Sequence, residues 1–287
     1  MNAALYKIRV LMENVKFEHS IFALPFAYLG MVLAARGLPT LHQFVWITVA
    51  MVSARTFAMS VNRLADSPED ARNPRTARRP LPQGLLGPWE VAGCAALSFA
   101  VLVLAAWQLN PLALMLLPLA AVILVGYAYT KRFTWLCHFI LGLADGGAPF
   151  GGWIAVTGTL SWEPVILCLA VAFWVGGFDL IYACQDVEFD RSNKLHSVPA
   201  RFSIATSLTQ ARLWHAATIL LLALVGLMDA LSWPYWVGLA CAVGLLAYEH
   251  SLVSPKDLSR LNMAFFNVNG YIAVLVFAAA ALGVFLA

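Results

Sequence analysis

Long apolar runs follow one another along the chain, separated by short polar connections. Each run is close to the roughly 20 residues that an α-helix needs to cross a bilayer. Nine such runs can be placed in the 287 residues. They occupy residues 18–36, 43–65, 89–108, 110–130, 136–157, 163–185, 208–228, 231–250 and 264–286. The pattern predicts an all-α polytopic membrane protein with nine transmembrane helices.

The connections between these runs differ in charge. The turns at 109–111, 158–163 and 229–234 are short and carry no Lys or Arg. Sixteen of the 18 basic residues lie in the N-terminal segment or in the other connections, whereas Arg36 is on the opposite side and Arg55 is inside the second run. By the positive-inside rule, the N-terminus and the charged loops face the cytoplasm and the C-terminus lies outside. We expect an integral protein of a bacterial inner membrane.

Composition agrees with this class and narrows the function. The chain is 61% hydrophobic and 11% charged, with a mean hydropathy of +0.78. No cleavable signal peptide is expected at its start. The net charge of +3 is too small to suggest a nucleic-acid partner. The five cysteines are scattered without a C-x-x-C pair, which favours apolar packing over metal or redox roles.

Much of the charge is concentrated in one stretch, NRLADSPEDARNPRTARRPLP, at residues 62–82. Asn62, Asp66 and Asp70 are spaced four apart at the end of the second predicted helix. At 100° per residue they span about 80° of one helix face. Arg55 falls only about 20° from Asn62, two turns deeper on that face.

A second acidic stretch, FDLIYACQDVEFD, ends the sixth predicted helix at residues 178–190. On a continuous helix, Asp179, Asp186 and Asp190 fall within about 40° of one another. The two stretches superimpose with a shift of 120 residues, and each is followed by arginine and proline. The shift spans four helices, an even number, so both helices run in the same direction. The chain is therefore expected to be a single domain, residues 1–287, with a parallel pseudo-repeat of about 1–130 and 131–287.

Paired carboxylates of this kind suggest a metal and a phosphate. Acids placed face to face resist ionisation unless a cation joins them. Mg²⁺ takes one or two carboxylates together with phosphate oxygens, and nearby arginines can bind the remaining phosphate charge. A single D-x-x-x-D can instead be a solvated helix cap, and the arginine run can anchor anionic lipid. Two copies in phase favour two Mg²⁺ ions on a diphosphate.

These residues resemble the UbiA superfamily of intramembrane prenyltransferases, over essentially the whole chain. Residues 62–82 are similar to its first aspartate motif, N-x-x-x-D-x-x-x-D followed by R-T-x-x-R-P, and residues 179–202 to its second. YAYTKR, residues 127–132, is similar to its Y-x-x-x-K loop. The second motif resembles most the 4-hydroxybenzoate polyprenyltransferase-like branch, part of which serves menaquinone synthesis through the futalosine route. Lys194 and Ser203 depart from it, standing where that branch usually has glycine.

The resemblance implies nine helices around a central cavity, a lateral opening to lipid and a cytoplasmic cap formed by the motif loops. It also implies two Mg²⁺ ions and a polyprenyl diphosphate donor. The acceptor is then an aromatic acid, 4-hydroxybenzoate or a dihydroxynaphthoate, in ubiquinone or menaquinone biosynthesis. Membrane lipid is the surrounding partner, and no obligate protein partner is evident.

The expected chemistry is electrophilic aromatic substitution by the allylic cation left when diphosphate departs. The predicted metal ligands are Asn62, Asp66, Asp70, Asp186 and Asp190. The four aspartates and Lys131 form the predicted catalytic set, with Lys131 contacting diphosphate or the acceptor carboxylate. The predicted substrate-binding residues are Arg55, Asn62, Arg75, Arg78, Arg79, Tyr127, Arg132, Asp179, Tyr182 and Arg201.

Other interpretations stay open at this point. A transporter for an anionic substrate also places charge within helices, although inverted repeats and broken helices are more typical of that class. An alcohol phosphatidyltransferase would need a D-G-x-x-A-R motif, which the sequence lacks. A UbiA-type enzyme with another acceptor is a further alternative. Asp145 lies in LADGGAPFGGW, a run typical of close helix packing. His138, His196 and His215 show no ligand spacing, and Glu249 and His250 receive no role.

Overall fold

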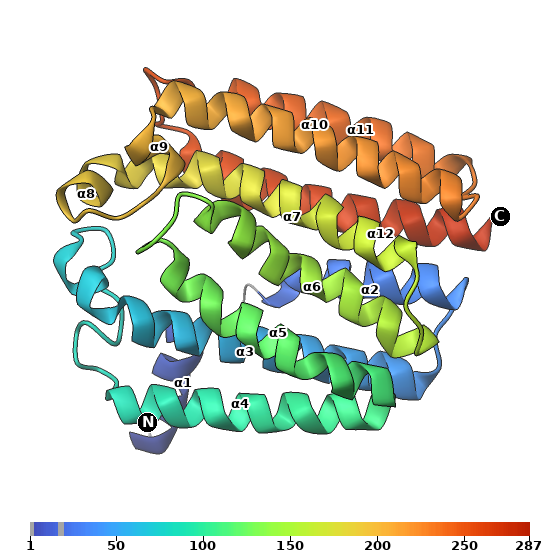
Figure 1. Cartoon of the computed structure of the whole chain (residues 1–287), viewed down its shortest axis with the longest axis horizontal. Coiled ribbons are helices and arrows are strands. Elements are labelled where there is room, and N and C mark those ends of the chain that lie inside the picture. The colour runs from blue at the N-terminus through green and yellow to red at the C-terminus, as the bar shows by residue number, and fades with distance from the viewer. Residues whose placement is uncertain (1–2, 17–19) are drawn as a thin grey trace.

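The computed structural model describes residues 3–16 and 20–287, and their regular secondary structure is helical. Within those ranges the only β-type pairing is an isolated bridge between Ser254 and Asp257. The helices in chain order are α1 (Ala3–Asn14), α2 (Ser20–Ala35), α3 (Leu41–Arg72), α4 (Pro88–Leu109), α5 (Pro111–Thr130), α6 (Cys137–Thr157), α7 (Trp162–Tyr182), the 3₁₀ turn η2 (Ala183–Asp186), α8 (Val187–Ser192), α9 (Val198–Arg201), α10 (Ile204–Met228), α11 (Trp233–Ser251), the π-helical turn η3 (Met263–Val268) and α12 (Asn269–Phe285). Figure 1 shows the long helices packed side by side along one direction.

The nine predicted spans coincide with α2–α7 and α10–α12. Seven of these segments are long and apolar enough to cross a membrane, counted over the described part of the chain. The two others are α2, whose apolar part covers Leu24–Ala35, and α11. The all-helical membrane class is confirmed, whereas nine crossings are not established by helix length and hydropathy. The predicted start of the first span, at residues 18–19, lies outside the described residues.

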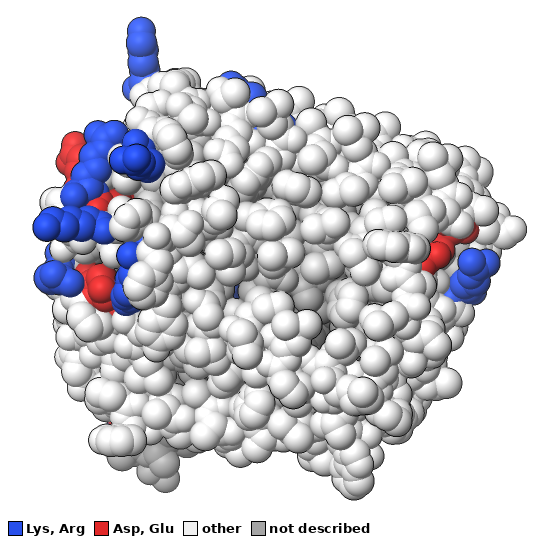
Figure 2. All heavy atoms as spheres, viewed as in Figure 1, with Lys and Arg blue, Asp and Glu red and all other residues white. Residues whose placement is uncertain are grey.

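Charged connections gather at one end of the bundle. The loop after α3, the turn between α5 and α6, and the short helices α8 and α9 all lie at the left of Figure 1. Lys and Arg side chains cluster at the same end in Figure 2. Arg36 is at the other end, with its guanidinium 4.0 Å from the carboxylate of Asp229. The predicted separation of charge is therefore present in the fold, while the membrane side that each end faces stays a prediction.

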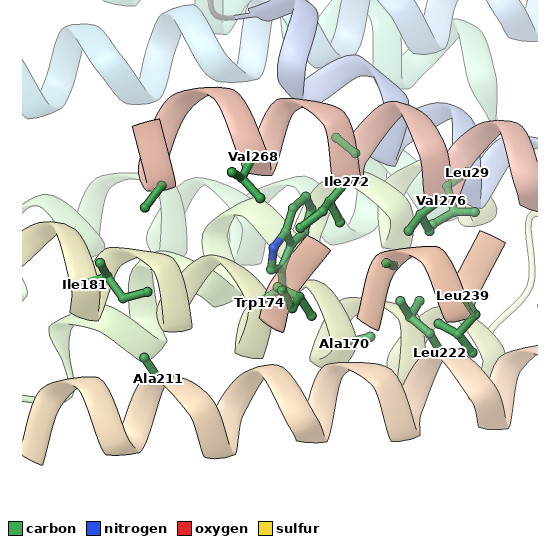
Figure 3. Close-up of a cluster of buried hydrophobic side chains, with 14 of the residues drawn as sticks. Leu29, Ala170, Trp174, Ile181, Ala211, Leu222, Leu239, Val268, Ile272 and Val276 are labelled. Carbon is green, nitrogen blue, oxygen red and sulfur yellow. The ribbon is translucent and has the colours of Figure 1, made fainter. Parts of the chain in front are cut away.

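A large apolar core lies between α7, α10, α11 and α12, with α2 along one side. Figure 3 shows Trp174 of α7 in this core, near Ile272 of α12. The indole N–H of Trp174 donates a 2.8 Å hydrogen bond to Asn269 Oδ1, because a buried indole needs a polar partner. This core packs α7, which begins the second acidic motif, against α10, α11 and α12.

Small residues allow α6 to approach its neighbours closely. A Cβ added at Gly146 would collide with the carbonyl oxygen of Cys168 in α7, and one at Gly152 would collide with that of Ala27 in α2. The interpretation of LADGGAPFGGW as a packing run is correct at these two positions. A Cβ at Gly147 or Gly151 would meet nothing within 4 Å, and both residues line a cavity together with Gly152 and Asp145.

Two elements differ from the predicted pattern. The sixth span does not continue as one helix through the second motif, because α7 ends at Tyr182 and the chain tightens into η2. A 3₁₀ turn has about 3.0 residues per turn instead of 3.6, so Asp186 and Asp190 leave the phase predicted from Asp179. The helix α1 was not predicted. Its Val10 packs with Leu81, Leu86 and Val91, beneath the loop after α3.

Candidate active site at the charged end of the bundle

The first acidic motif lies on the last turns of α3. This helix begins with a capping box between Thr40 and Gln43 and continues without interruption to Arg72, so its polar residues keep their helical phase. Asn62 Nδ2 donates a 2.8 Å hydrogen bond to Asp66 Oδ2, one turn further along. The predicted one-sided arrangement of Asn62, Asp66 and Asp70 is therefore built into the helix.

Asp70 is held by the loop that follows α3. Arg79 Nη1 donates to both carboxylate oxygens of Asp70, at 2.8 and 2.6 Å. The hydroxyl of Thr76 donates to the backbone carbonyl of Asp70 at 3.1 Å. Only 7% of Asp70 is exposed, so the arginine compensates a carboxylate that has lost most of its water.

The same loop also reaches the second motif. Arg75 donates two hydrogen bonds to the carboxylate of Asp186, from Nε at 3.0 Å and from Nη2 at 2.6 Å. Asn73 Nδ2 adds a third hydrogen bond to Asp186 at 3.3 Å. Burial lowers the pKa of the Arg75 guanidinium, but its bond to Asp186 outweighs this and raises that pKa above the ordinary value. Residues about 110 positions apart in the sequence are thus joined by a bidentate ion pair.

Asp190, in the short helix α8, is completely buried. Its Oδ2 accepts a 2.7 Å hydrogen bond from the hydroxyl of Ser197, and its Oδ1 lies 2.8 Å from Lys131 Nζ. Burial alone would lower the pKa of the Lys131 ammonium, but the charge of Asp190 raises it above the ordinary value. Lys131 is consequently held in its cationic form.

Two adjacent basic residues in the α5–α6 turn connect the motifs. Lys131 contacts Asp190 of the second motif, while Arg132 Nη2 lies 3.3 Å from Asp66 Oδ1 of the first. Arg132 also forms a 2.9 Å ion pair with Glu69 and donates to the carbonyl of Ala65 at 2.7 Å. All three predicted motifs therefore meet at the same end of the bundle.

A cavity of about 640 Å³ opens among the helices on the membrane side of these ion pairs. It is lined mainly by apolar residues of α3–α7 and α12, and the molecule is hollowed near the middle of the face in Figure 2. Its polar lining is confined to Arg55, Tyr127, Asp145, Asp179 and Asn269. Arg55 Nε is buried without a hydrogen-bond partner among the described residues. A largely apolar space with a few fixed polar groups is typical of a small-molecule site.

Residues 23–271 match the family model described as the UbiA prenyltransferase family. The chain belongs to this family. It is 33% identical to the 4-hydroxybenzoate octaprenyltransferase of Cupriavidus necator, over 88% of each chain. The enzyme of the same name from Photobacterium profundum is 28% identical over 98% of each chain.

Solved structures show the same UbiA fold. The apo structure of a UbiA homolog from Aeropyrum pernix K1 has a TM-score of 0.84 and 33% identity, covering 92% of this chain and 97% of that one. A UbiA homolog from Archaeoglobus fulgidus bound to GPP and Mg²⁺ has a TM-score of 0.71 at 20% identity, covering 95% and 99%. The chain is therefore an integral-membrane prenyltransferase of the UbiA family, which sets aside the transporter and phosphatidyltransferase interpretations.

The remaining predicted residues of this UbiA protein lie around the same end. The hydroxyl of Tyr127 donates to the carbonyl of Ala58 at 3.2 Å. Tyr182 receives a 3.1 Å hydrogen bond from Arg75 and stacks on Phe265, with 4.1 Å between ring centroids. Arg78 and Arg201 are exposed and form no ion pair with any residue that the structure describes. Their contact with diphosphate therefore stays a prediction.

Both departures from the family pattern have a structural explanation. Lys194 adopts a φ of 58°, a left-handed conformation that glycine adopts without steric cost. Ser203 caps α10, because its hydroxyl accepts a 3.0 Å hydrogen bond from the N–H of Thr206. The lysine is thus a strained replacement, whereas the serine gains a capping bond.

Sequence reasoning missed three features of the site. His138 is buried, as a core histidine would be, but the sequence does not indicate that its Nδ1 lies 2.6 Å from Asp179 Oδ2 in the cavity wall. Asp145 faces the cavity that Arg55 also lines. Glu69 pairs with Arg132. Asp145 precedes the packing position Gly146 by one residue, so it lies on a different side of α6 from the contact with α7. This helical phase is the sequence feature that points to the cavity.

Proposed function

We propose that this protein transfers a polyprenyl group from a prenyl diphosphate to a ring carbon of a hydroxylated aromatic acid, with Mg²⁺ as cofactor. The observation that carries the proposal is the meeting of both aspartate motifs with Lys131, Arg132 and Arg75 beside the apolar cavity. The reaction needs carboxylates that bind the metal, cations that bind the diphosphate and a water-free space for the isoprenoid chain.

The donor set suits Mg²⁺ on a diphosphate. Among the described residues, no three His, Cys, Asp or Glu side chains are close enough to form a protein-only metal site. Mg²⁺ does not require one, since it usually takes one or two carboxylates, with phosphate and water supplying the other oxygens. Asp66 and Asp70 would serve one ion, with Asn62 supporting, and Asp186 and Asp190 the other. Mg²⁺ would neutralise charge that develops on the departing diphosphate.

Basic side chains around the carboxylates would bind the diphosphate itself. Lys131, Arg75 and Arg79 each pair with a motif aspartate, so each lies where a bridging phosphate would be held. Fixed cations stabilise the leaving group as the C–O bond breaks, without reorganisation at that moment. The apolar lining of the cavity keeps water from the allylic cation until the ring carbon attacks and loses its proton.

The acceptor is proposed to be 4-hydroxybenzoate, with a dihydroxynaphthoate as the alternative. Arg55 lines the cavity with its Nε unpaired among the described residues, so it can receive the carboxylate of an aromatic acid. The curated relatives at about 30% identity carry the name 4-hydroxybenzoate octaprenyltransferase, which favours the benzoate and a long prenyl chain. Both acceptors place the protein in quinone biosynthesis.

The membrane arrangement proposed for this activity has nine crossings and the charged end in the cytoplasm. The short helix α2 and the less apolar α11 would complete the bundle around the cavity. A prenyl chain would then reach the site from the bilayer, while its diphosphate stays at the charged end. The two motif-bearing helices would be equivalent members of a parallel pseudo-repeat within one domain.

The decisive experiment is an acceptor screen with purified protein. Protein, Mg²⁺ and a prenyl diphosphate are incubated with 4-hydroxybenzoate, a dihydroxynaphthoate or other phenolic acids, and the products are identified by mass spectrometry. A C-prenylated 4-hydroxybenzoate is expected. Absence of product with every acceptor would contradict the proposal, and prenylation of the naphthoate alone would correct the acceptor.

Metal-ligand variants test the site assignment. Asp66→Ala and Asp186→Ala are each expected to abolish turnover, because each removes a carboxylate from one proposed ion. Glu163→Gln, at the other end of the bundle, is the matched control and should turn over normally. Retained activity in either aspartate variant would refute its role as a ligand.

A further inference from the structure

One histidine joins the cavity wall to the second aspartate motif. His138 lies in the first turn of α6 and is 2% exposed. On one side its Nδ1 is 2.6 Å from Asp179 Oδ2, and Asp179 lines the cavity. On the other side its Nε2 is 3.3 Å from the backbone nitrogen of Val198, at the start of α9. The imidazole therefore bridges α7 and the start of α9.

The partner of Nε2 fixes the tautomer of His138. A backbone N–H can only donate, so Nε2 must present its lone pair to Val198. The ring proton is then on Nδ1 and is donated to Asp179.

The segment that His138 holds is the one that orients Asp190. Ser197, next to Val198, donates a 2.7 Å hydrogen bond to Asp190 Oδ2. The N–H of His196 donates to the carbonyl of Lys131 at 2.7 Å, and the thiol of Cys137 donates to the carbonyl of His196 at 3.3 Å. Residues 196–198 are thus fixed between α6, the α5–α6 turn and a proposed metal ligand.

We propose that His138 is a positioning residue for prenyl transfer, with a separate task on each ring nitrogen. Nδ1 holds the Asp179 carboxylate at the cavity wall, where the acceptor and the allylic cation meet. Nε2 holds Val198 and thereby the Ser197 hydroxyl that orients Asp190 at the diphosphate. The inference rests on the proposed function, since it assigns these two ends to acceptor and donor.

Two amide variants, His138→Asn and His138→Gln, separate the tasks because each keeps one of the two hydrogen bonds and loses the other. In His138→Asn the amide nitrogen replaces Nδ1 and can still donate to Asp179, but the side chain is too short to reach Val198. In His138→Gln the amide group occupies the place of Nε2, and its oxygen can accept from Val198 while the bond to Asp179 is lost. His138→Phe keeps the ring volume and loses both bonds.

The expected kinetic effects are opposite for the two amides. Loss of an outer partner of a metal ligand typically costs about 10–100-fold. His138→Asn should therefore raise the KM for prenyl diphosphate by about tenfold or more and leave kcat within a few-fold. His138→Gln should keep the donor KM and lower kcat by a similar factor. Calorimetric binding of inorganic pyrophosphate with Mg²⁺ should weaken in the asparagine variant only.

A purely structural histidine would behave differently. In that case both amides would lose activity in parallel with their thermal stability, or both would match the wild type, and either result overturns the proposal. A wild-type protein that prenylates no acceptor refutes the proposed function instead. Pyrophosphate binding by the wild type and the two amide variants still decides whether Nε2 supports the diphosphate end. Should His138→Phe fail to fold, the asparagine–glutamine comparison decides alone.

Discussion

Individual side chains of the site are arranged as pairs of opposite charge. Each proposed metal-binding aspartate has a basic partner from the loop after α3 or from the α5–α6 turn. The pairs are Asp66–Arg132, Asp70–Arg79, Asp186–Arg75 and Asp190–Lys131. Buried charges are costly unless paired, and loss of one partner leaves the other uncompensated. The same basic residues that make the acids tolerable in the fold are therefore available to bind phosphate.

The fork of Arg75 provides a test of this double role. Arg75→Lys keeps the charge but cannot form the two parallel bonds to Asp186, and hydrogen bonds to charged groups contribute about 1.5–3 kcal/mol. We expect the KM for prenyl diphosphate to rise by about tenfold or more. Steady-state kinetics measures this. Arg72→Lys is the control, because Arg72 is exposed and its one hydrogen bond among the described residues goes to the backbone carbonyl of Pro68. An equal effect in both variants would contradict the role of the fork.

Lys194, in the loop between α8 and α9, offers a stability test. Its φ of 58° costs a non-glycine residue about 1–2 kcal/mol. Lys194→Gly should therefore raise the unfolding temperature, whereas Lys194→Ala, which keeps a Cβ, should not. Thermal denaturation in detergent measures both. A glycine variant no more stable than the alanine variant would show that the strain is relieved elsewhere.

Residue types and spacing predicted most of the charged end. Asn62, Asp66 and Asp70 keep the phase expected of a helix because α3 is continuous, and Lys131 and Arg132 lie beside the motifs as the family resemblance implied. The bridge of His138 could not be predicted, because it depends on α6, α7 and α9 meeting in space. A lone histidine carries no sequence pattern that identifies its partners.

Among the elements, the break after α7 matters most for the site. The helix ends at Tyr182 although no proline or glycine follows it until Pro199. Asp186 at the end of η2 is held by Arg75 and Asn73, and Asp190 is held by Ser197 and Lys131. These long-range bonds compete with the local helical preference, so periodicity alone predicted a helix that is too long.

Close packing of α6 against α2 gives an element-level prediction. Gly152→Ala would drive its Cβ into the carbonyl oxygen of Ala27, and overpacking typically costs about 1–3 kcal/mol. We expect a lower unfolding temperature and reduced activity, because α6 also carries His138 and part of the cavity wall. Gly93→Ala on α4 is the control, since nothing lies within 4 Å of the added Cβ there. Equal stability of the two variants would contradict the packing argument.

For the whole molecule, the uneven distribution of charge predicts its orientation. Basic residues gather at the end that carries the aspartate motifs, so the positive-inside rule places that end in the cytoplasm. A fluorescent-protein fusion after Ala287 should be dark and an alkaline phosphatase fusion there should be active in a bacterial host, if nine helices cross. The reverse result would show an even number of crossings or the opposite orientation. N-terminal fusions serve as the control with the opposite expectation.

A buried carboxylate lies at the end of the bundle opposite the aspartate motifs. Asp229 follows α10, and its Oδ2 is buried without a hydrogen-bond partner among the described residues. Burial, reinforced by the nearby Glu163, raises the pKa of Asp229 from its ordinary value of 3.8 to about 6, and Arg36 opposes the shift only partly. Compared with the unfolded chain, the folded protein therefore keeps this carboxyl protonated up to a higher pH.

This shift predicts how stability depends on pH. Below about pH 4 the carboxyl is protonated in both states, and between pH 4 and 6 the unfolded chain ionises first, so stability falls as the pH rises. Above about pH 6 the full penalty is present. Asp229→Asn removes the ionisation, so its unfolding temperature relative to wild type should increase from pH 4 to pH 7. Thermal denaturation in detergent across this range measures the difference. A difference independent of pH would show that Asp229 ionises as readily in the fold as in the unfolded chain, and that Arg36 compensates its charge after all.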